Sequence, residues 1–340
     1  MAIDLSELAA TAQELVAPKK GILAADESTG TIARRLESIN VNNTEANRRD
    51  YREMLFTADG VGDYISGVIL FDETLRQAAS DETPMVSVLT ERGMVPGIKV
   101  DTGAKPLAGT DGELVTEGLD GLRERLAEYR DIGAKFAKWR GVITIGESIP
   151  STYCIAVNAH ALARYAALCQ EAGLVPIVEP EVLMEGGHTI EQAEEATEAT
   201  LRAVFAELAA QGVAAEGMLL KPNMVVTGYD RSERAGAAEV AERTVRVFQK
   251  TVPSSMPGIV FLSGGQNDED AIVNLQAIAE RGAVEKAPWQ LSYSYGRGLQ
   301  ALPLKTWGGM AGNVATAQEA FLERCRLTSA ARSGTYRNTN

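Results

Sequence analysis

The chain has 340 residues, of which 45% are hydrophobic and 23% charged, and its formal net charge is −13. This composition is ordinary for a globular protein, and a chain of this length can bury a large core without disulfides. The acidic balance argues against nonspecific binding to nucleic acid or to anionic membranes, because both attract basic surfaces. An acidic surface is still compatible with a localised basic pocket for a small anionic substrate.

The cysteines and the N-terminus indicate where the protein resides. Cys154, Cys169 and Cys325 are the only cysteines, and none is paired in a CxxC spacing. That pattern is typical of a reducing compartment. Residues 1–8 are acidic and amphipathic, without the basic start and apolar segment of a secretory signal. No apolar stretch approaches membrane-spanning length, so we expect a cytoplasmic protein.

Histidine is scarce, which restricts the chemistry. His160 and His188 are the only two, and they form no HxxxH or HExxH pair. The sequence therefore argues against a histidine-ligated zinc site, and we expect no metal. Acid–base chemistry would have to use carboxylates and lysines.

In chain order, short apolar runs alternate with longer amphipathic stretches. Eight runs are predicted to be buried strands, at residues 21–26, 67–72, 95–100, 136–140, 175–181, 217–222, 258–264 and 289–296. Amphipathic helices are predicted at residues 119–131, 158–172, 189–211, 233–250 and 268–281. This alternation indicates a parallel sheet, and eight repeats suggest closure into a single-domain (β/α)₈ TIM barrel.

A doubly wound open sheet is the alternative architecture. No run is followed by GxGxxG or GxxxxGK[ST], the phosphate loops that are common in that class. No change in composition marks a domain boundary. We expect the barrel to occupy residues 1–327 and the polar residues 328–340 to form a mobile C-terminal tail.

Lys221 is the most unusual of the polar residues because it ends an apolar run and is followed by Pro222 and Asn223. An unpaired buried lysine costs several kcal/mol. Burial and nearby positive charge both favour the neutral amine, which can attack a carbonyl. The alternative is a structural lysine that reaches solvent or pairs with a carboxylate.

Other polar residues also gather at the C-terminal ends of the predicted strands, where a barrel carries its active site. They are Asp26, Lys99, Lys138, Arg140, Glu179, Glu181, Ser263 and Arg297. Taken singly, each has a structural explanation as a helix cap, an ion pair or a rim residue. Taken together they would each be costly to desolvate without a chemical purpose.

The combined set suits an enzyme that forms an imine with a phosphorylated carbonyl compound. Lys138 would favour the neutral form of Lys221, and Glu179 could transfer the protons that imine formation requires. Asp26 could abstract a hydroxyl proton. The glycine loop that follows Ser263, together with Arg297, suits a phosphate between the last two strands.

Seven sequence blocks at these positions resemble the class I fructose-1,6-bisphosphate aldolases. They are residues 21–30, 97–101, 136–140, 175–181, 219–224, 261–266 and 294–297. The resemblance implies reversible cleavage of fructose 1,6-bisphosphate to dihydroxyacetone phosphate and glyceraldehyde 3-phosphate. It implies no cofactor, since the protonated imine is the electron sink. It also implies a homotetramer.

Specific roles follow from the resemblance. Lys221 matches the Schiff-base lysine, Glu179 the general acid–base, Asp26 the residue that takes the carbon-4 hydroxyl proton, and Lys138 the lysine that tunes the site. The positions that match substrate contacts or lie beside them are Lys99, Glu181, Ser263, Gly264, Gly265, Ser294, Gly296 and Arg297, and, toward the other end of the substrate, Ser28, Thr31, Arg35, Arg49 and Arg140.

The chain departs from the family pattern in two respects. Thr31 and Arg34 stand where serine and lysine are common. Many members end in a tyrosine that assists proton transfer, whereas this sequence ends at Asn340, and Tyr336 matches an earlier tyrosine. We therefore expect another proton donor for the enamine carbon, or slower exchange there.

Two other functions share parts of this pattern. A transaldolase or deoxyribose-phosphate aldolase would have the lysine but would not need two phosphate sites. A noncatalytic barrel would not need Lys138, Glu179 and Lys221 together.

Overall fold

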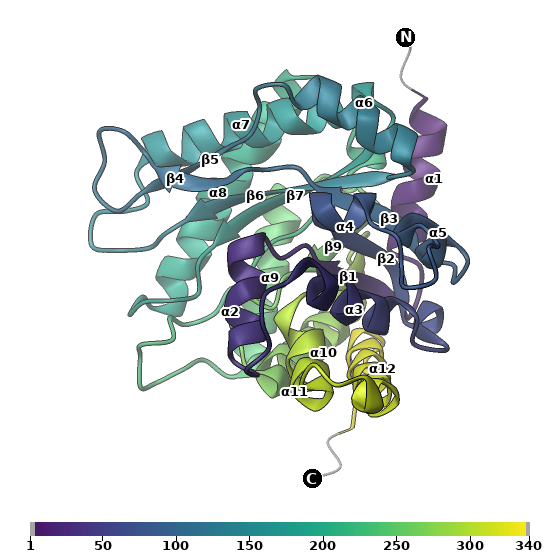
Figure 1. Cartoon of the computed structure of the whole chain (residues 1–340). Coiled ribbons are helices and arrows are strands. Elements are labelled where there is room, and N and C mark those ends of the chain that lie inside the picture. The colour runs from purple at the N-terminus through teal and green to yellow at the C-terminus, as the bar shows by residue number, and fades with distance from the viewer. Residues whose placement is uncertain (1–3, 338–340) are drawn as a thin grey trace.

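A computed structural model describes residues 4–337 (Figure 1). Eight parallel strands close into a barrel in the order β1-β10-β9-β8-β7-β6-β3-β2. The predicted (β/α)₈ barrel is therefore confirmed, and the open-sheet alternative is wrong. Residues 1–3 and 338–340, which include the predicted ending at Asn340, lie outside the described part.

Every predicted strand has a counterpart in the barrel. The barrel strands are β1 (Gly21–Ala25), β2 (Ile65–Leu70), β3 (Val95–Lys99), β6 (Phe136–Ile143), β7 (Val175–Val182), β8 (Leu219–Leu220), β9 (Gly258–Phe261) and β10 (Gln290–Tyr295). Strands β4 (Gly103–Pro106) and β5 (Leu114–Glu117) form an antiparallel hairpin outside the barrel. This hairpin follows β3 and extends away from the barrel (Figure 1).

Helices surround the barrel. They are α1 (Leu5–Leu15), α2 (Thr29–Glu37), α3 (Glu45–Phe56), α4 (Asp72–Arg76), α5 (Met85–Thr90), α6 (Leu122–Ile132), α7 (Thr152–Glu171), α8 (Ile190–Ala210), α9 (Ala237–Thr251), α10 (Asp268–Val284), α11 (Arg297–Trp307) and α12 (Val314–Arg332). Three short 3-10 turns lie at Val61–Asp63, Ala215–Gly217 and Ala311–Asn313. The five predicted helices correspond to α6 to α10.

The barrel interior changes from apolar to charged along strands β6 and β7. Alternate strand residues share a face, so Phe136 and Lys138 both point inward, as do Ile177 and Glu179. Phe136 and Ile177, the apolar members of these pairs, belong to one buried cluster that also holds residues of α1. Helix α1 thus closes the N-terminal end of the barrel, while the charged members open toward the C-terminal end.

Gly97 separates the apolar and charged levels of β3 for a steric reason. A Cβ atom at this position would lie 2.2 Å from the ring of Phe136, which fills the barrel there. The missing side chain of Gly97 therefore allows the aromatic ring of β6 to pack inside the barrel. Lys99, two residues further along β3, then points into the open end.

The C-terminal tail predicted from residue 328 is wrong in its starting point, because α12 continues to Arg332. Thr328 and Ser329 are buried in this helix. Arg332, only 6% exposed, donates hydrogen bonds to the carbonyls of Val16 (2.7 Å) and Ala17 (2.6 Å). Polar composition was misleading here, because these side chains are hydrogen-bonded inside the protein rather than to water.

Candidate active site

A cavity of about 520 Å³ opens at the C-terminal end of the barrel. Its walls come from the ends of seven of the eight barrel strands and the segments that follow them. The predicted site residues that line it are Asp26, Ser28, Thr31, Arg35, Lys99, Lys138, Arg140, Glu179, Glu181, Lys221, Ser263, Gly264, Gly265, Ser294, Gly296 and Arg297. The barrel therefore brings together residues that are as much as 271 positions apart in the sequence.

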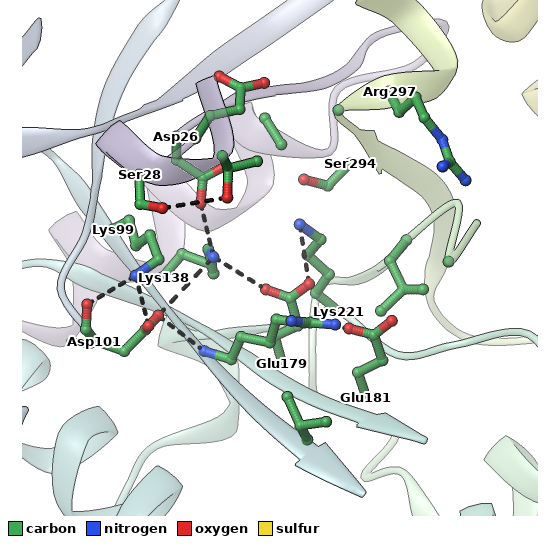
Figure 2. Close-up of a pocket in the computed structure, with 18 of the residues that line it drawn as sticks. Asp26, Ser28, Lys99, Asp101, Lys138, Glu179, Glu181, Lys221, Ser294 and Arg297 are labelled. Carbon is green, nitrogen blue, oxygen red and sulfur yellow. Dashed lines mark hydrogen bonds and ion pairs between the residues drawn. The ribbon is translucent and has the colours of Figure 1, made fainter. Parts of the chain in front are cut away.

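Glu179 lies between the two buried lysines at the centre of the cavity. Its Oε1 atom is 3.2 Å from Nζ of Lys221, and its Oε2 atom is 3.4 Å from Nζ of Lys138. All three side chains are 6% exposed or less. Figure 2 shows them converging from β6, β7 and the end of β8. One carboxylate can therefore exchange protons with the amine of Lys221 while Lys138 stays bound to its other oxygen.

Asp26 shares Lys138 with Glu179, at 2.7 Å between Oδ2 and Nζ. Burial opposes ionisation of Asp26, but the charges of Lys138, Lys221 and Lys99 outweigh it and hold the pKa of this carboxyl below its ordinary range. Burial would lower the pKa of Lys138, yet Asp26, Glu179 and Asp101 together raise it above its ordinary value. Asp26 is thus held as a carboxylate, beside a lysine that keeps its charge.

Asp101 organises the wall formed by β3 and β6. Its Oδ1 atom accepts a hydrogen bond from Nζ of Lys99 at 2.6 Å, and its Oδ2 atom accepts one from the backbone N–H of Arg140 at 3.3 Å. The same carboxylate lies 4.0 Å from Lys138. Asp101 was not predicted as a site residue, although its position two residues after Lys99 placed it on the same face of the strand.

Arg35 and Arg140 lie on the same side of the cavity as Lys99, and each has a carboxylate partner. Arg35 of α2 pairs with Glu27, and Arg140 of β6 pairs with Glu181. Ser28 and Thr31 lie beside them, with their hydroxyl oxygens 3.2 Å apart. Glu27 also lines the cavity and was likewise missed by the sequence analysis; its position directly after Asp26 was the only signal.

The opposite side of the cavity is formed by a glycine loop and the start of α11. Gly264 and Gly265 have φ angles of 57° and 86°, which favour glycine. Arg297 forms no ion pair with any residue between Asp4 and Arg337, and Figure 2 shows its guanidinium apart from the labelled carboxylates. The buried hydroxyl of Ser294 likewise finds no hydrogen-bond partner among the described residues. Such groups are available to an anionic ligand, as is the N-terminus of α11.

Glu185 also lines this side of the cavity and was not predicted. A Cβ atom at Gly265 would lie 3.4 Å from Oε1 of Glu185 and 3.2 Å from Nη2 of Arg297. The loop glycine is therefore packed between a carboxylate and a guanidinium. No strand-end pattern identified Glu185, because it lies in the loop after β7.

Arg49 is the one predicted site residue that the structure places elsewhere. It lies on α3, pairs with Asp50 at 2.6 Å, and lines a separate cavity beside Trp307. Its neighbour Arg52 points inward instead, 3.7 Å from Glu27. The direction in which each arginine of α3 points depends on its position around the helix.

Tyr336, the tyrosine nearest the end of the described chain, is also outside the cavity. It packs, half-buried, against the main hydrophobic cluster. It therefore lies away from the reacting groups in this structure.

The family assignment rests on a match that spans nearly the whole chain. A family model described as glycolytic fructose-bisphosphate aldolase class I matches residues 7–340. This chain belongs to the class I fructose-bisphosphate aldolase family.

Similar proteins come from bacteria, plants and a parasite. A Xanthomonas campestris pv. campestris protein named as a probable fructose-bisphosphate aldolase class 1 is 55% identical over 336 residues, which cover 98% of this chain and 100% of the relative. The cytosolic fructose-bisphosphate aldolase 6 of Arabidopsis thaliana is 54% identical, with 97% and 92% covered.

A solved structure of the Plasmodium falciparum aldolase, in complex with TRAP and a small-molecule inhibitor, superposes with a TM-score of 0.96. It is 49% identical, and the match covers 98% of this chain and 96% of that chain.

Between Asp4 and Arg337, no group of three or more His, Cys, Asp or Glu side chains is arranged to hold a metal ion. Within the same range, no helix is both long and apolar enough to cross a membrane.

Proposed function

We propose that Lys221 is the Schiff-base nucleophile with which this class I aldolase cleaves fructose 1,6-bisphosphate reversibly to dihydroxyacetone phosphate and glyceraldehyde 3-phosphate. The observation that carries the proposal is the shared carboxylate: Glu179 contacts Lys221 and Lys138 through its two oxygens in a nearly dry part of the cavity. A buried amine with an adjacent proton carrier is what imine formation requires.

The first half of the reaction uses Lys221 and Glu179. Glu179 takes a proton from Lys221, and the neutral amine that results attacks the carbon-2 ketone to give a carbinolamine. Glu179 then returns that proton to the carbinolamine hydroxyl group, which leaves as water. The product is a protonated imine. Lys138 remains a cation beside this group, held by Asp26 and Glu179.

The second half uses Asp26. Its carboxylate takes the proton from the carbon-4 hydroxyl, the carbon 3–carbon 4 bond breaks, and the electron pair moves into the iminium to form an enamine. Glyceraldehyde 3-phosphate leaves as the aldehyde. Protonation of the enamine at carbon 3 and hydrolysis of the imine then release dihydroxyacetone phosphate and restore Lys221.

The two phosphates of the substrate account for the cations at the two sides of the cavity. We assign the carbon-1 phosphate to Arg297, Ser294, Gly296 and the loop of Ser263, Gly264 and Gly265. We assign the carbon-6 phosphate to the opposite side, formed by Lys99, Arg140, Arg35, Ser28 and Thr31. Glu181 supports this side through its pair with Arg140. Holding both ends fixes the reacting carbons between Lys221 and Asp26.

Trapping the imine tests the proposal. Dihydroxyacetone phosphate and borohydride are added to the full-length protein, and the adduct is mapped by mass spectrometry. We expect a single adduct on Lys221 that is absent from Lys221→Met, together with full activity in EDTA. An adduct on another residue, or loss of activity on chelation, would overturn the mechanism.

We also propose a homotetramer that acts in the cytoplasm on a phosphorylated sugar, without nucleic-acid or membrane partners. The family resemblance and the acidic charge support this, and the named Arabidopsis relative is described as cytosolic. Light scattering should give a mass four times that of the 36.3 kDa chain. A monomeric mass would contradict the tetramer.

A further inference from the structure

The backbone around Asp26 is held by side chains that none of the catalytic roles above includes. Strand β1 ends at Ala25, so Asp26 lies just beyond the regular ladder of the barrel. Pairing between β1 and β10 stops at Leu23 and Tyr295. The next carbonyl of β1, that of Ala24, therefore has no strand partner on the β10 side.

Gln300 takes the place of that missing partner. Its Nε2 atom donates a 2.7 Å hydrogen bond to the carbonyl of Ala24, and its Oε1 atom accepts a 3.0 Å bond from the hydroxyl of Tyr51. Gln300 is 1% exposed. Both ends of the amide are thus fixed, and the side chain continues the ladder after the main chain has turned into α11.

Gln300 also lies one helical turn after Arg297, at the N-terminal end of the same helix. This turn approaches β1 closely, since a Cβ atom at Gly296 would lie 3.2 Å from the carbonyl of Ala24. One rigid turn of helix therefore carries both the guanidinium assigned to a phosphate and the amide that holds the strand of Asp26.

A second buried side chain holds the other side of Asp26. Arg52, 1% exposed, donates to the carbonyl of Glu27 at 3.0 Å and, at 3.4 Å, to that of Ala25. The carbonyls before and after Asp26 are therefore each bound. Arg52 also neutralises the buried Glu27, so removing it would leave an unpaired charge and confuse a functional test. Gln300 is neutral and offers the cleaner experiment.

We propose that Gln300 is a positioning residue that fixes Asp26 for the cleavage step and ties its placement to the phosphate end of α11. The inference rests on the proposed role of Asp26 in taking the carbon-4 hydroxyl proton. Asp26 must meet that proton while it stays 2.7 Å from Lys138. Displacement of a catalytic group by about 1 Å can cost roughly 100-fold in rate.

The test replaces Gln300 with methionine, which keeps the length and loses both hydrogen bonds. We expect kcat for cleavage of fructose 1,6-bisphosphate to fall about 10- to 100-fold. Trapping of dihydroxyacetone phosphate on Lys221 should proceed at the wild-type rate, because imine formation uses Glu179 and not Asp26. Adding Gln300→Met to Asp26→Asn should cause no further loss, since residues that act through one group are not additive.

Gln170 provides a matched control. It is also 1% exposed, and its Nε2 atom donates to the carbonyls of Ala214 (2.8 Å) and Gly217 (3.2 Å) before strand β8, at the opposite end of the barrel. Gln170→Met should lower Tm and leave kcat unchanged. Equal cleavage rates in the two methionine variants would overturn the inference, as would further loss in the double variant.

Two additional results complete the test. If Gln300→Met fails to fold, Gln300→Glu keeps the acceptor for Tyr51 and loses the donor to Ala24, with the same expected loss of cleavage. A wild-type adduct that maps away from Lys221 would refute the proposed function. A normal adduct on Lys221 with unimpaired cleavage in Gln300→Met would refute the positioning role alone.

Discussion

The two sides of the cavity balance their positive charge differently. Arg35 and Arg140 are paired with Glu27 and Glu181, whereas Arg297 has no carboxylate partner among residues 4–337. A phosphate that reaches Arg297 can bind directly. A phosphate on the opposite side must compete with carboxylates already in place. We therefore expect the Arg297 side to bind a phosphate of every substrate. The side with Arg35 and Arg140 should determine how strongly the enzyme prefers the bisphosphate to the monophosphate.

Loss of Arg297 should give the largest effect. Arg297→Gln removes charge-assisted hydrogen bonds to phosphate that are worth about 1.5–3 kcal/mol each. Two such bonds predict a fall in kcat/KM of roughly 10²- to 10⁴-fold, for fructose 1,6-bisphosphate and fructose 1-phosphate alike. Steady-state kinetics with both substrates measure it. Arg297→Lys should recover part of the loss, and a defect confined to the bisphosphate would reverse the assignment of the two sides.

Removing a carboxylate that competes with the second phosphate should have a smaller effect and should strengthen substrate binding instead of weakening it. Glu27→Gln frees Arg35 and removes a negative charge near the second phosphate, but it also leaves the buried Arg52 without its carboxylate partner, so we expect the variant to lose stability as well. We expect KM for fructose 1,6-bisphosphate to fall by about 3- to 10-fold, which corresponds to roughly 1 kcal/mol for a partly exposed charge pair. KM for fructose 1-phosphate should not change.

The matched control for that variant is Glu113→Gln. Glu113 is 3% exposed and accepts hydrogen bonds from Ser151, outside the cavity. The Glu113→Gln variant should be less stable than the wild type, with unchanged KM values for fructose 1,6-bisphosphate and fructose 1-phosphate. Arg35→Gln should act in the opposite sense to Glu27→Gln and weaken only the bisphosphate. Equal shifts for both substrates would show that Glu27 does not compete with the second phosphate.

The smallest expected effect is a loss of folding stability at acid pH, caused by His188 in a loop that packs near the Arg297 side of the cavity. The buried His188 lies in the loop after β7, whose Met184 carbonyl binds the backbone N–H of Tyr229, and the Tyr229 hydroxyl donates to the carbonyl of Gly264. Burial lowers the pKa of His188 below its ordinary value. The unfolded chain then binds a proton that the folded chain does not, so stability falls as pH drops through about 6.5.

Urea unfolding at pH 7.5 and pH 5.5 measures this loss. His188→Gln should lose less free energy of unfolding over that interval than the wild type, even if it is less stable at both values. Parallel losses in the two proteins would assign the acid sensitivity to other groups.

Much of this site could be predicted because barrels place chemistry at strand ends. Lys221 and Glu179 followed from a short apolar run that ends in a charge, combined with the two-residue period of a strand. Asp101 and Glu27 were missed because their importance comes from the lysine and arginine that they contact. Those contacts depend on how neighbouring strands and helices meet, and sequence adjacency gives only a weak indication of them.

Helical positions were predicted less well than strand positions. Arg49 and Arg52 are three residues apart on α3, yet one lies at a separate surface cavity and the other is buried beneath the site. Small changes in where a helix begins rotate every side chain on it, so its inward face cannot be assigned without the packing. The misplaced start of the tail has a similar origin, since Arg332 is buried through carbonyls more than 300 residues away.

The position of Arg332 also constrains how the molecule can form during synthesis. Its bond to Val16 spans 316 residues, and β1 pairs with β10 at Ile22 and Ser294. Ribosomes extend a chain at about 5–20 residues per second, and folding usually begins from the N-terminal part. Here the first strand must wait for nearly the whole message to be translated before its second neighbour exists. Until then the emerging N-terminal strands present an unpaired edge, the kind of surface that chaperones bind.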